Sequence, residues 1–259
     1  MIVAIAAKFF STAVIVISVL LIVQRYGSRI GGVAAGMPIV IGPGFFFLIT
    51  EQNAAFVANA AVATLHALNA TLFFTAAYIH FSSRLTPITC TAASSLIWGV
   101  TAILFQLVSQ DLVVSLLVFL LSLTILAKVN ARRAHQHTSK STTKASSQTI
   151  AIRGLIAGLL VAVAAGGSST LGPSLSGLIM TFPIGTLMIA LALHQRSGTS
   201  ATQATLSSAH WGMLALAVFV TAIAAVIGQK PPMVTFLAAL ALSLGTTGLL
   251  TLYAIKTSK

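Results

Sequence analysis

Residues 112–130 have the sequence LVVSLLVFLLSLTILAKVN, an apolar run that is long enough to cross a membrane as one helix. Similar runs fill most of the chain, which has 259 residues, 57% of them hydrophobic and 6% charged, and a mean hydropathy of +1.02. A soluble domain carries about 25% charged residues. The composition therefore excludes a soluble protein and indicates an all-α integral membrane protein.

Apolar runs bounded by charged residues or by Gly and Pro predict about nine transmembrane helices. The expected spans are 2–23, 30–50, 54–81, 87–108, 112–130, 151–169, 173–194, 199–228 and 233–255. Residues 131–150 are rich in Ser, Thr, Lys and His, which is typical of a flexible loop. These spans leave no room for a catalytic domain outside the membrane.

Lys and Arg collect in alternate loops, and cytoplasmic loops carry the excess of positive charge in membrane proteins. The net charge is +12, from 14 Lys and Arg against 2 Asp and Glu. Twelve cations fall on one expected side: Arg25, Arg29, Arg84, Lys128, Arg132, Arg133, Lys140, Lys144, Arg153, Arg196, Lys256 and Lys259. Lys8, Glu51, Asp111 and Lys230 fall on the other. We therefore expect the N-terminus outside and the C-terminus in the cytoplasm. The small size, minimal loops and Ala-rich spans are typical of a bacterial inner membrane protein.

This positive charge is a topology signal that can also hold the 131–150 loop near anionic lipid. It is not a nucleic-acid footprint, because it lies between apolar runs. Membrane lipids are therefore expected partners, and nucleic acid is not.

The two halves of the chain match each other. Gln52, Asn59 and His66 correspond to Arg196, Gln203 and His210 at an offset of 144 residues, and Gly31–Gly36 corresponds to Gly172–Gly177 at 141. The offset contains five spans, an odd number, so the second copy must enter the membrane the opposite way round. The sequence predicts two four-helix inverted repeats, 1–111 and 151–259, joined by a linker transmembrane helix at 112–130 and a basic cytoplasmic loop at 131–150.

In this general design the chain resembles the small inverted-repeat secondary transporters of bacteria. The resemblance covers the whole chain but is architectural, since no family-specific motif accompanies it. It implies alternating access, in which one half rocks against the other around a central site.

Gly and Pro interrupt the second and seventh expected spans at corresponding places. The second span contains Pro38, Gly42, Pro43 and Gly44, and the seventh contains Gly172, Pro173 and Pro183. Proline removes a backbone donor and clashes with the preceding turn, so we expect both helices to break. A bound solute can partner the freed backbone groups, which makes these residues candidates for substrate binding. The alternative is that they only allow kinks and close packing.

Polar side chains recur on the third and eighth expected spans. Gln52, Asn59 and His66 have the spacing of one helical face, Asn69 adds to it, and Arg196, Gln203 and His210 repeat it. We expect the two stripes to face each other across the centre, with Asn59, His66, Gln203 and His210 in contact with substrate. The alternative is hydrogen bonding between packed helices.

His66 and His210 are ionisable groups at matched positions, and histidine exchanges protons near neutral pH. We expect one or both to couple transport to protons or to bind an anionic group, with packing as the alternative. Glu51 is the other candidate acceptor of a proton or cation, unless it is a solvated loop charge. Asp111 is expected to begin a helix.

Motifs for other chemistries are missing from the sequence. It has no Walker-type phosphate loop, no His-Glu-x-x-His, no Gly-x-Ser-x-Gly and no pair of buried carboxylates. Cys90 is the single cysteine, and His135 and His137 offer two metal ligands without a third. We expect neither an enzyme nor a cofactor or metal site.

The expected function is secondary transport of a small polar solute across the inner membrane, at a site between the two broken helices. The alternatives are a non-transport subunit of a membrane complex, and a channel or lipid translocator. A homodimer is expected through the small residues of Gly245–Gly248.

Overall fold

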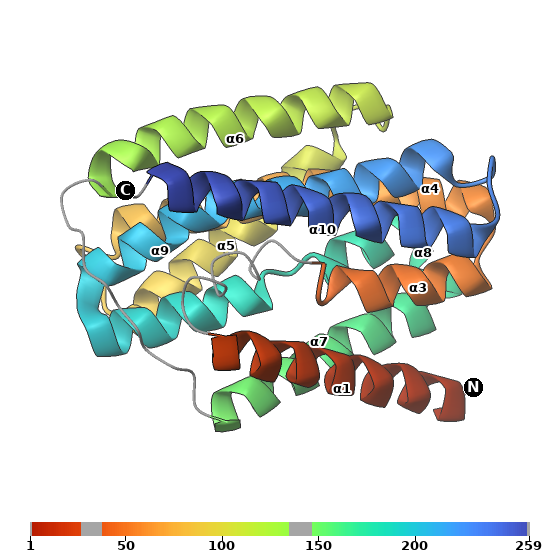
Figure 1. The fold of residues 1–259 in the computed structure, drawn as a ribbon, viewed down its shortest axis with the longest axis horizontal. Helices are drawn as coiled ribbons and strands as arrows, with labels where there is room; N and C mark the ends of the chain where they lie inside the picture. The colour runs from red at the N-terminus through yellow and green to blue at the C-terminus, as the bar shows by residue number, and fades with distance from the viewer. Residues whose placement is uncertain (1, 27–37, 135–146, 258–259) are drawn as a thin grey trace.

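The computed structural model describes residues 2–26, 38–134 and 147–257, and this part of the chain is helical without a β-strand (Figure 1). The helices are α1 (Ile2–Tyr26), α3 (Ile41–Glu51), α4 (Ala54–Phe81), α5 (Pro87–Gln106), α6 (Leu112–Ala134), α7 (Ser147–Gly166), α8 (Ser168–Met180), α9 (Ile184–Val226) and α10 (Pro232–Thr257). Six helical stretches in the described part are long and apolar enough to cross a membrane. The all-α class is confirmed, several apolar helices indicate a multi-pass membrane protein, and the count of nine spans stays a prediction.

Side-chain caps explain where two of the helices begin. The side chain of Asn53 accepts a hydrogen bond from the backbone N of Phe56 at 2.9 Å, at the start of α4. Asp111 Oδ1 accepts from the backbone N of Val113 and Val114 at 2.9 and 3.0 Å, at the start of α6. These groups would otherwise lack partners in a first helical turn. The prediction that Asp111 begins a helix is confirmed.

α4 is the central helix of the bundle. It packs against α5, α6, α8 and α9, and every residue from Ala60 to Leu72 is buried. The segment is rich in alanine, and such small side chains allow close approach of helices in lipid. In contrast, α5, α6 and α10 expose large apolar side chains, among them Leu96, Ile103, Leu117, Leu121, Leu249 and Leu252. This distribution suits a bundle whose outer surface faces lipid.

α1 and α7 lie side by side at the edge of the bundle, at the bottom of Figure 1. Gly154 and Gly158 of α7 permit this contact, since a Cβ on Gly158 would lie 2.6 Å from the carbonyl oxygen of Phe9. The four-residue spacing of the two glycines is a known close-packing pattern of membrane helices.

Several expected boundaries differ from the structure. The expected span 173–194 is divided between α8 and the first part of α9, and α9 changes direction at Gly198, which has φ 78°. Glycine adopts this left-handed region without the penalty of a Cβ. Gly31–Gly36 and most of the 131–150 loop lie outside the described residues, and α7 begins at Ser147 rather than at 151.

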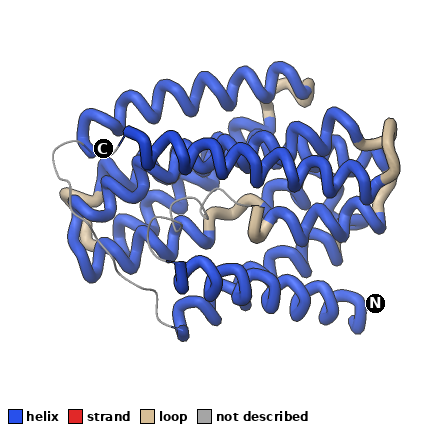
Figure 2. Tube along the Cα trace, viewed as in Figure 1, coloured by secondary structure: helices blue, strands red, loops and turns tan. Residues whose placement is uncertain are grey.

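Loops lie at the two ends of the bundle and also in its middle (Figure 2). The loops in the middle are residues 38–40, directly before α3, and residues 181–183, between α8 and α9. They place the starts of α3 and α9 and the end of α8 away from the two ends of the bundle (Figure 2).

Substitution of Gly177 should separate α8 from α4. A Cβ at this position would lie 2.5 Å from the carbonyl oxygen of Ala60 and 2.9 Å from Thr64 Oγ1. We expect Gly177→Ala to reduce the free energy of unfolding by about 1–3 kcal/mol, measured in detergent. Gly99→Ala in α5 is the matched control, because nothing lies within 4 Å of its added Cβ. Equal stability of the two variants would contradict the close α4–α8 contact.

Candidate functional site

Two helices begin inside the bundle shortly after a buried proline. α3 starts three residues after Pro38, and α9 starts directly after Pro183. The carbonyl oxygen of each proline accepts a hydrogen bond in the first turn, from Gly42 N and from Leu187 N, both at 2.8 Å. Because the residue before a proline disfavours helical geometry, Pro183 separates the end of α8 from the start of α9. Pro38 stands three residues before the start of α3.

The Gly42-Pro43-Gly44 segment does not break the helix, contrary to expectation. It lies in the first turn of α3, where the absent N–H of Pro43 removes no intrahelical bond. Around the start of the seventh expected span a break does fall where the sequence predicts it, since Gly172 has φ 74° and ψ 173° inside α8. Pro173 follows it directly. The chain from α8 to α9 is therefore interrupted at Gly172 and again at 181–183.

The first turn of α3 packs against the end of α8. The side chain of Met180 occupies the space that a Cβ on Gly44 would need, and Val161 of α7 lies 3.6 Å from the same position. The hydroxyl of Thr181 donates to the carbonyl oxygen of Gly177 at 2.6 Å. The structure thus brings the start of α3 and the end of α8 together, and apolar side chains fill their junction.

The two polar stripes predicted from the sequence do not face each other. Gln52 precedes the first residue of α4, and Asn59 is exposed near the start of this helix. Arg196 is exposed and precedes the change of direction at Gly198, so it does not share a helical face with Gln203. Spacing defines a face only within one straight helix, and each stripe extends beyond one.

His66 is buried beside the loop that joins α5 to α6. Its Nε2 lies 3.2 Å from the carbonyl oxygen of Ser109 and 2.9 Å from Oγ of Ser115. Ser115 Oγ donates to the carbonyl oxygen of Asp111 at 2.7 Å. His66 Nδ1 is buried without a hydrogen-bond partner among the described residues. His66 therefore joins α4 to the start of α6 through one ring nitrogen only.

His210 is also buried, and its partners lie on three helices. Its Nδ1 lies 3.0 Å from the carbonyl oxygen of Leu206 on α9. Its Nε2 lies 3.1 Å from Oγ1 of Thr75 on α4 and 3.5 Å from Nδ2 of Asn130 on α6. His210 thus joins α9 to α4 and to the far end of α6.

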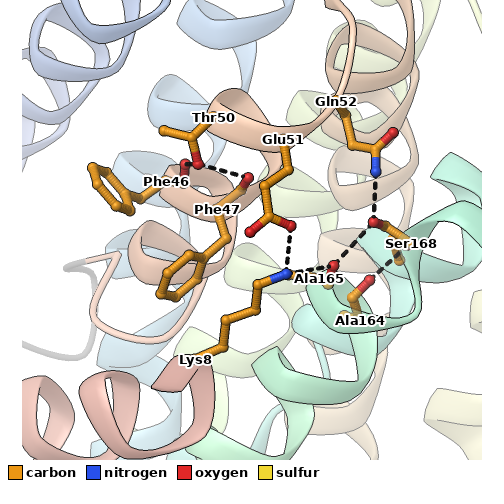
Figure 3. Close-up of polar contacts among 10 residues, drawn as sticks. Lys8, Phe46, Phe47, Thr50, Glu51, Gln52, Ala164, Ala165 and Ser168 are labelled. Atoms are coloured by element: carbon orange, nitrogen blue, oxygen red, sulfur yellow. Dashed lines mark hydrogen bonds and ion pairs between the residues drawn. The ribbon is translucent and has the colours of Figure 1, made fainter. Parts of the chain in front are cut away.

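A charged cluster at one end of the bundle joins α1, α3 and α7 (Figure 3). Lys8 is 5% exposed, and its ammonium group forms an ion pair with Glu51 at the end of α3. The same group donates to the carbonyl oxygen of Ala165 at 3.2 Å and lies 5.8 Å from the ring centre of Phe47. The carboxylate of Glu51 thus compensates a buried cation, so Glu51 is not simply a solvated loop charge.

Polar contacts between distant segments hold both ends of the bundle. Next to the charged cluster, Gln52 Nε2 donates to Oγ of Ser168 at 2.9 Å (Figure 3). At the opposite end of α4, Gln203 Nε2 donates to Oγ of Ser82 at 3.1 Å. Thr199 Oγ1 donates to the carbonyl oxygen of Ser82 at 3.0 Å. Each end is therefore closed by neutral hydrogen bonds, and one end also by an ion pair.

Sequence reasoning missed Lys8, Ser115 and Asn130 as members of polar sites. The loop-charge pattern treats Lys8 only as an exception to topology. Its signal is its position within an apolar run, because a charge there is costly unless it is paired. Ser115 and Asn130 carry no such signal, since each becomes informative only when α6 is packed against a histidine.

No group of three His, Cys, Asp or Glu side chains suited to a metal ion occurs in the part of the chain that the structure describes. His135 and His137 lie outside it. No protein-family model matches the chain, and no curated protein and no solved structure matches it significantly. The site's chemistry must therefore be judged from its own geometry.

The two partners of the ion pair should differ in their effect on stability. Glu51→Gln leaves the buried ammonium group of Lys8 without a counter-charge, and we expect a loss of about 2–3 kcal/mol in unfolding free energy. Lys8→Met leaves a carboxylate whose side chain is 41% exposed and can be hydrated, so the loss should be smaller. Denaturation in detergent measures both.

The double variant Lys8→Met with Glu51→Gln should recover part of the loss, because neither charge then remains unpaired. Purely additive losses, or a larger loss for Lys8→Met than for Glu51→Gln, would contradict a buried ammonium that depends on Glu51.

Proposed function

We propose that this protein is a secondary transporter that moves a small polar solute by alternating access, with the starts of α3 and α9 at the centre of its path. The observation that carries this proposal is the pair of helices that begin inside the bundle after Pro38 and Pro183. Such helix starts present backbone N–H groups that have no intrahelical partner. Interrupted helices at corresponding positions form the substrate sites of many inverted-repeat transporters.

The packing of the helices supports an inverted repeat of residues 1–111 and 151–259. α4 packs against α5 as α9 packs against α10, and the pairs α1–α7 and α4–α9 bring equivalent helices together. The matched histidines both bond to α6, His66 at Ser115 and His210 at Asn130. α6 is then the linker helix between the two copies.

Alternating access also requires contacts that can close each end in turn. Lys8 to Ala165 and Gln52 to Ser168 would join the two copies at one end, and Gln203 to Ser82 at the other. Hydrogen bonds between membrane helices contribute about 0.6 kcal/mol each on average. A solute that binds one conformation more tightly than the other can supply the free energy to break a few such hydrogen bonds at one end while others form at the opposite end.

The exposed charges favour one orientation. Arg84 and Arg196 are exposed at the end where Gln203 meets Ser82, whereas Asp111 is exposed at the start of α6. The excess of Lys and Arg in cytoplasmic loops would place the first end in the cytoplasm. The Lys8–Glu51 cluster would then close the outer face of a bacterial inner membrane.

A second candidate is a non-transport subunit of a membrane complex. The apolar closure of the junction by Met180 and Val161 favours it, because a packed, dry junction needs no solute. The two candidates differ in whether water reaches the starts of α3 and α9.

Single cysteines at Gly42 and Gly185 test for this water path. Gly185 has nothing within 4 Å of an added Cβ, and Gly42 has only Pro38 Cβ at 3.9 Å, so both positions accept a small side chain. Cys90→Ser provides the background, since serine can replace the thiol's bond to the carbonyl oxygen of Tyr78. In proteoliposomes we expect both thiols to react with a membrane-impermeant maleimide, and the accessible side to vary between conformations.

Gln110→Cys and Ser83→Cys, which are exposed in the loops at either end of α5, report the sidedness of the vesicles. Ala102→Cys, in a buried position of α5, reports a dry interior. If Gly42→Cys and Gly185→Cys stay as inert as Ala102→Cys from both sides, the transporter proposal fails and the complex subunit is favoured. Equal simultaneous reaction from both sides would indicate a channel.

A further inference from the structure

The two matched histidines differ in how fully their ring nitrogens are satisfied. A carbonyl oxygen can only accept a hydrogen bond, and a primary amide nitrogen can only donate. The partners of each ring therefore assign its tautomer. His66 Nε2 faces the carbonyl oxygen of Ser109, so Nε2 carries the hydrogen. His66 Nδ1 is then an unprotonated acceptor, buried with no donor among the described residues.

Two further acceptors near His66 also lack a donor. Asn69 lies one turn after His66 on α4, and its Oδ1 is buried without a partner in the described part of the chain. Gln106 Nε2 donates to the carbonyl oxygen of Ala63, one turn before His66, and Gln106 Oε1 is likewise unpartnered there. Three residues advance a helix by about 4.5 Å. Two of these acceptors therefore lie one turn apart on α4, at His66 and Asn69, and the third belongs to a side chain bound one turn before them, at Ala63.

His210 shows the opposite pattern. Its Nδ1 faces the carbonyl oxygen of Leu206 and donates to it. Its Nε2 lies 3.1 Å from Oγ1 of Thr75 and 3.5 Å from Nδ2 of Asn130. Both ring nitrogens of His210 therefore have partners, and His210 acts as a structural group that joins three helices.

We propose that His66 Nδ1 is the proton-binding site of this protein and that its proton is the coupling ion of the transport cycle. The coupling role rests on the proposed function, whereas the binding site rests on the local geometry alone. The proton comes from water, adds to Nδ1 and leaves Nε2–H in place. It supplies a donor to a region where the amide oxygens of Asn69 and Gln106 have none.

Charged groups near His66 are few. Asp111, on the exposed loop before α6, is the nearest along the contacts described, because its carbonyl oxygen binds Ser115. α5 offers Cys90 near its opposite end, and α8 has no titratable residue. α6 contains Lys128, Arg132 and Arg133, all near its opposite end. α9 contributes His194, Arg196 and His210, and His210 contacts α4 at Thr75, nine residues beyond His66. We therefore expect the proton to enter through the Asp111 loop. The carboxylate of Asp111 would then be the nearest negative charge to the protonated ring.

Nitrogen-15 NMR of histidine-labelled protein in detergent or nanodiscs tests the binding site directly. Chemical shifts distinguish protonated from unprotonated ring nitrogens, and His66→Gln and His210→Gln assign the two signals. We expect the His66 signal to show the Nε2–H tautomer at about pH 8 and to shift at Nδ1 as the pH falls to about 5. The His210 signal should show the Nδ1–H tautomer and stay unchanged.

If His66→Gln does not fold, Ser115→Ala assigns the His66 signal in a protein that keeps the histidine. A His66 ring that stays neutral over this range, or a His210 ring that titrates instead, overturns the proposed binding site. Both outcomes are independent of whether the protein transports a solute.

The coupling role is tested with the Gly42→Cys labelling assay at the two pH values. We expect the ratio of labelling from the two sides to change severalfold between about pH 8 and about pH 5, and His66→Gln to abolish this change. His210→Gln, in which His66 is intact, should retain the pH-dependent change in the labelling ratio. If labelling occurs from each side but ignores pH, the transporter stands and proton coupling fails. If no labelling occurs, the transporter proposal itself fails.

Discussion

α4 is enclosed by α5, α6, α8 and α9, and this enclosure determines where polar groups can stand in the bundle. From Ala60 to Leu72 no residue reaches the surface, so each polar side chain must find its partner within the protein. Thr64 and Thr71 donate to the carbonyl oxygen one turn back, at 2.8 and 3.2 Å. His66 has to reach another helix instead. Buried groups that lack a partner in this segment are therefore unusual, and they carry information about function.

Local features of the fold could be predicted from the sequence because they depend on neighbouring residues. Apolar runs indicate the helices, the side chain of Asp111 caps α6, and Gly172 breaks α8. The direction of a side chain is less predictable, because it depends on where a helix begins and bends. Gln52 lies before α4, and Arg196 lies before the change of direction at Gly198. Neither residue therefore shares a helical face with the other members of the stripe that spacing predicts.

Long-range contacts are the part of the candidate site that spacing cannot supply. Lys8 and Glu51 are 43 residues apart, and Lys8 and Ala165 are 157 apart. The packing of α1 and α3 against α7 brings them together. Because a buried ammonium group needs a counter-charge, removal of Glu51 should cost this end of the bundle more than removal of one neutral hydrogen bond.

In the proposed repeat the two copies would differ in their side-chain chemistry. His66 and His210 both bond to α6, at Ser115 and Asn130, which lie about 22 Å apart along the helix. Equivalent packing of this kind would give two conformations similar energies. The chemistry differs, because His66 keeps a free nitrogen, and the position equivalent to Glu51 is the uncharged Gln195. A ligand shifts a two-state equilibrium only by interacting differently with the two states, so such unmatched groups are where a proton or a solute can exert that difference.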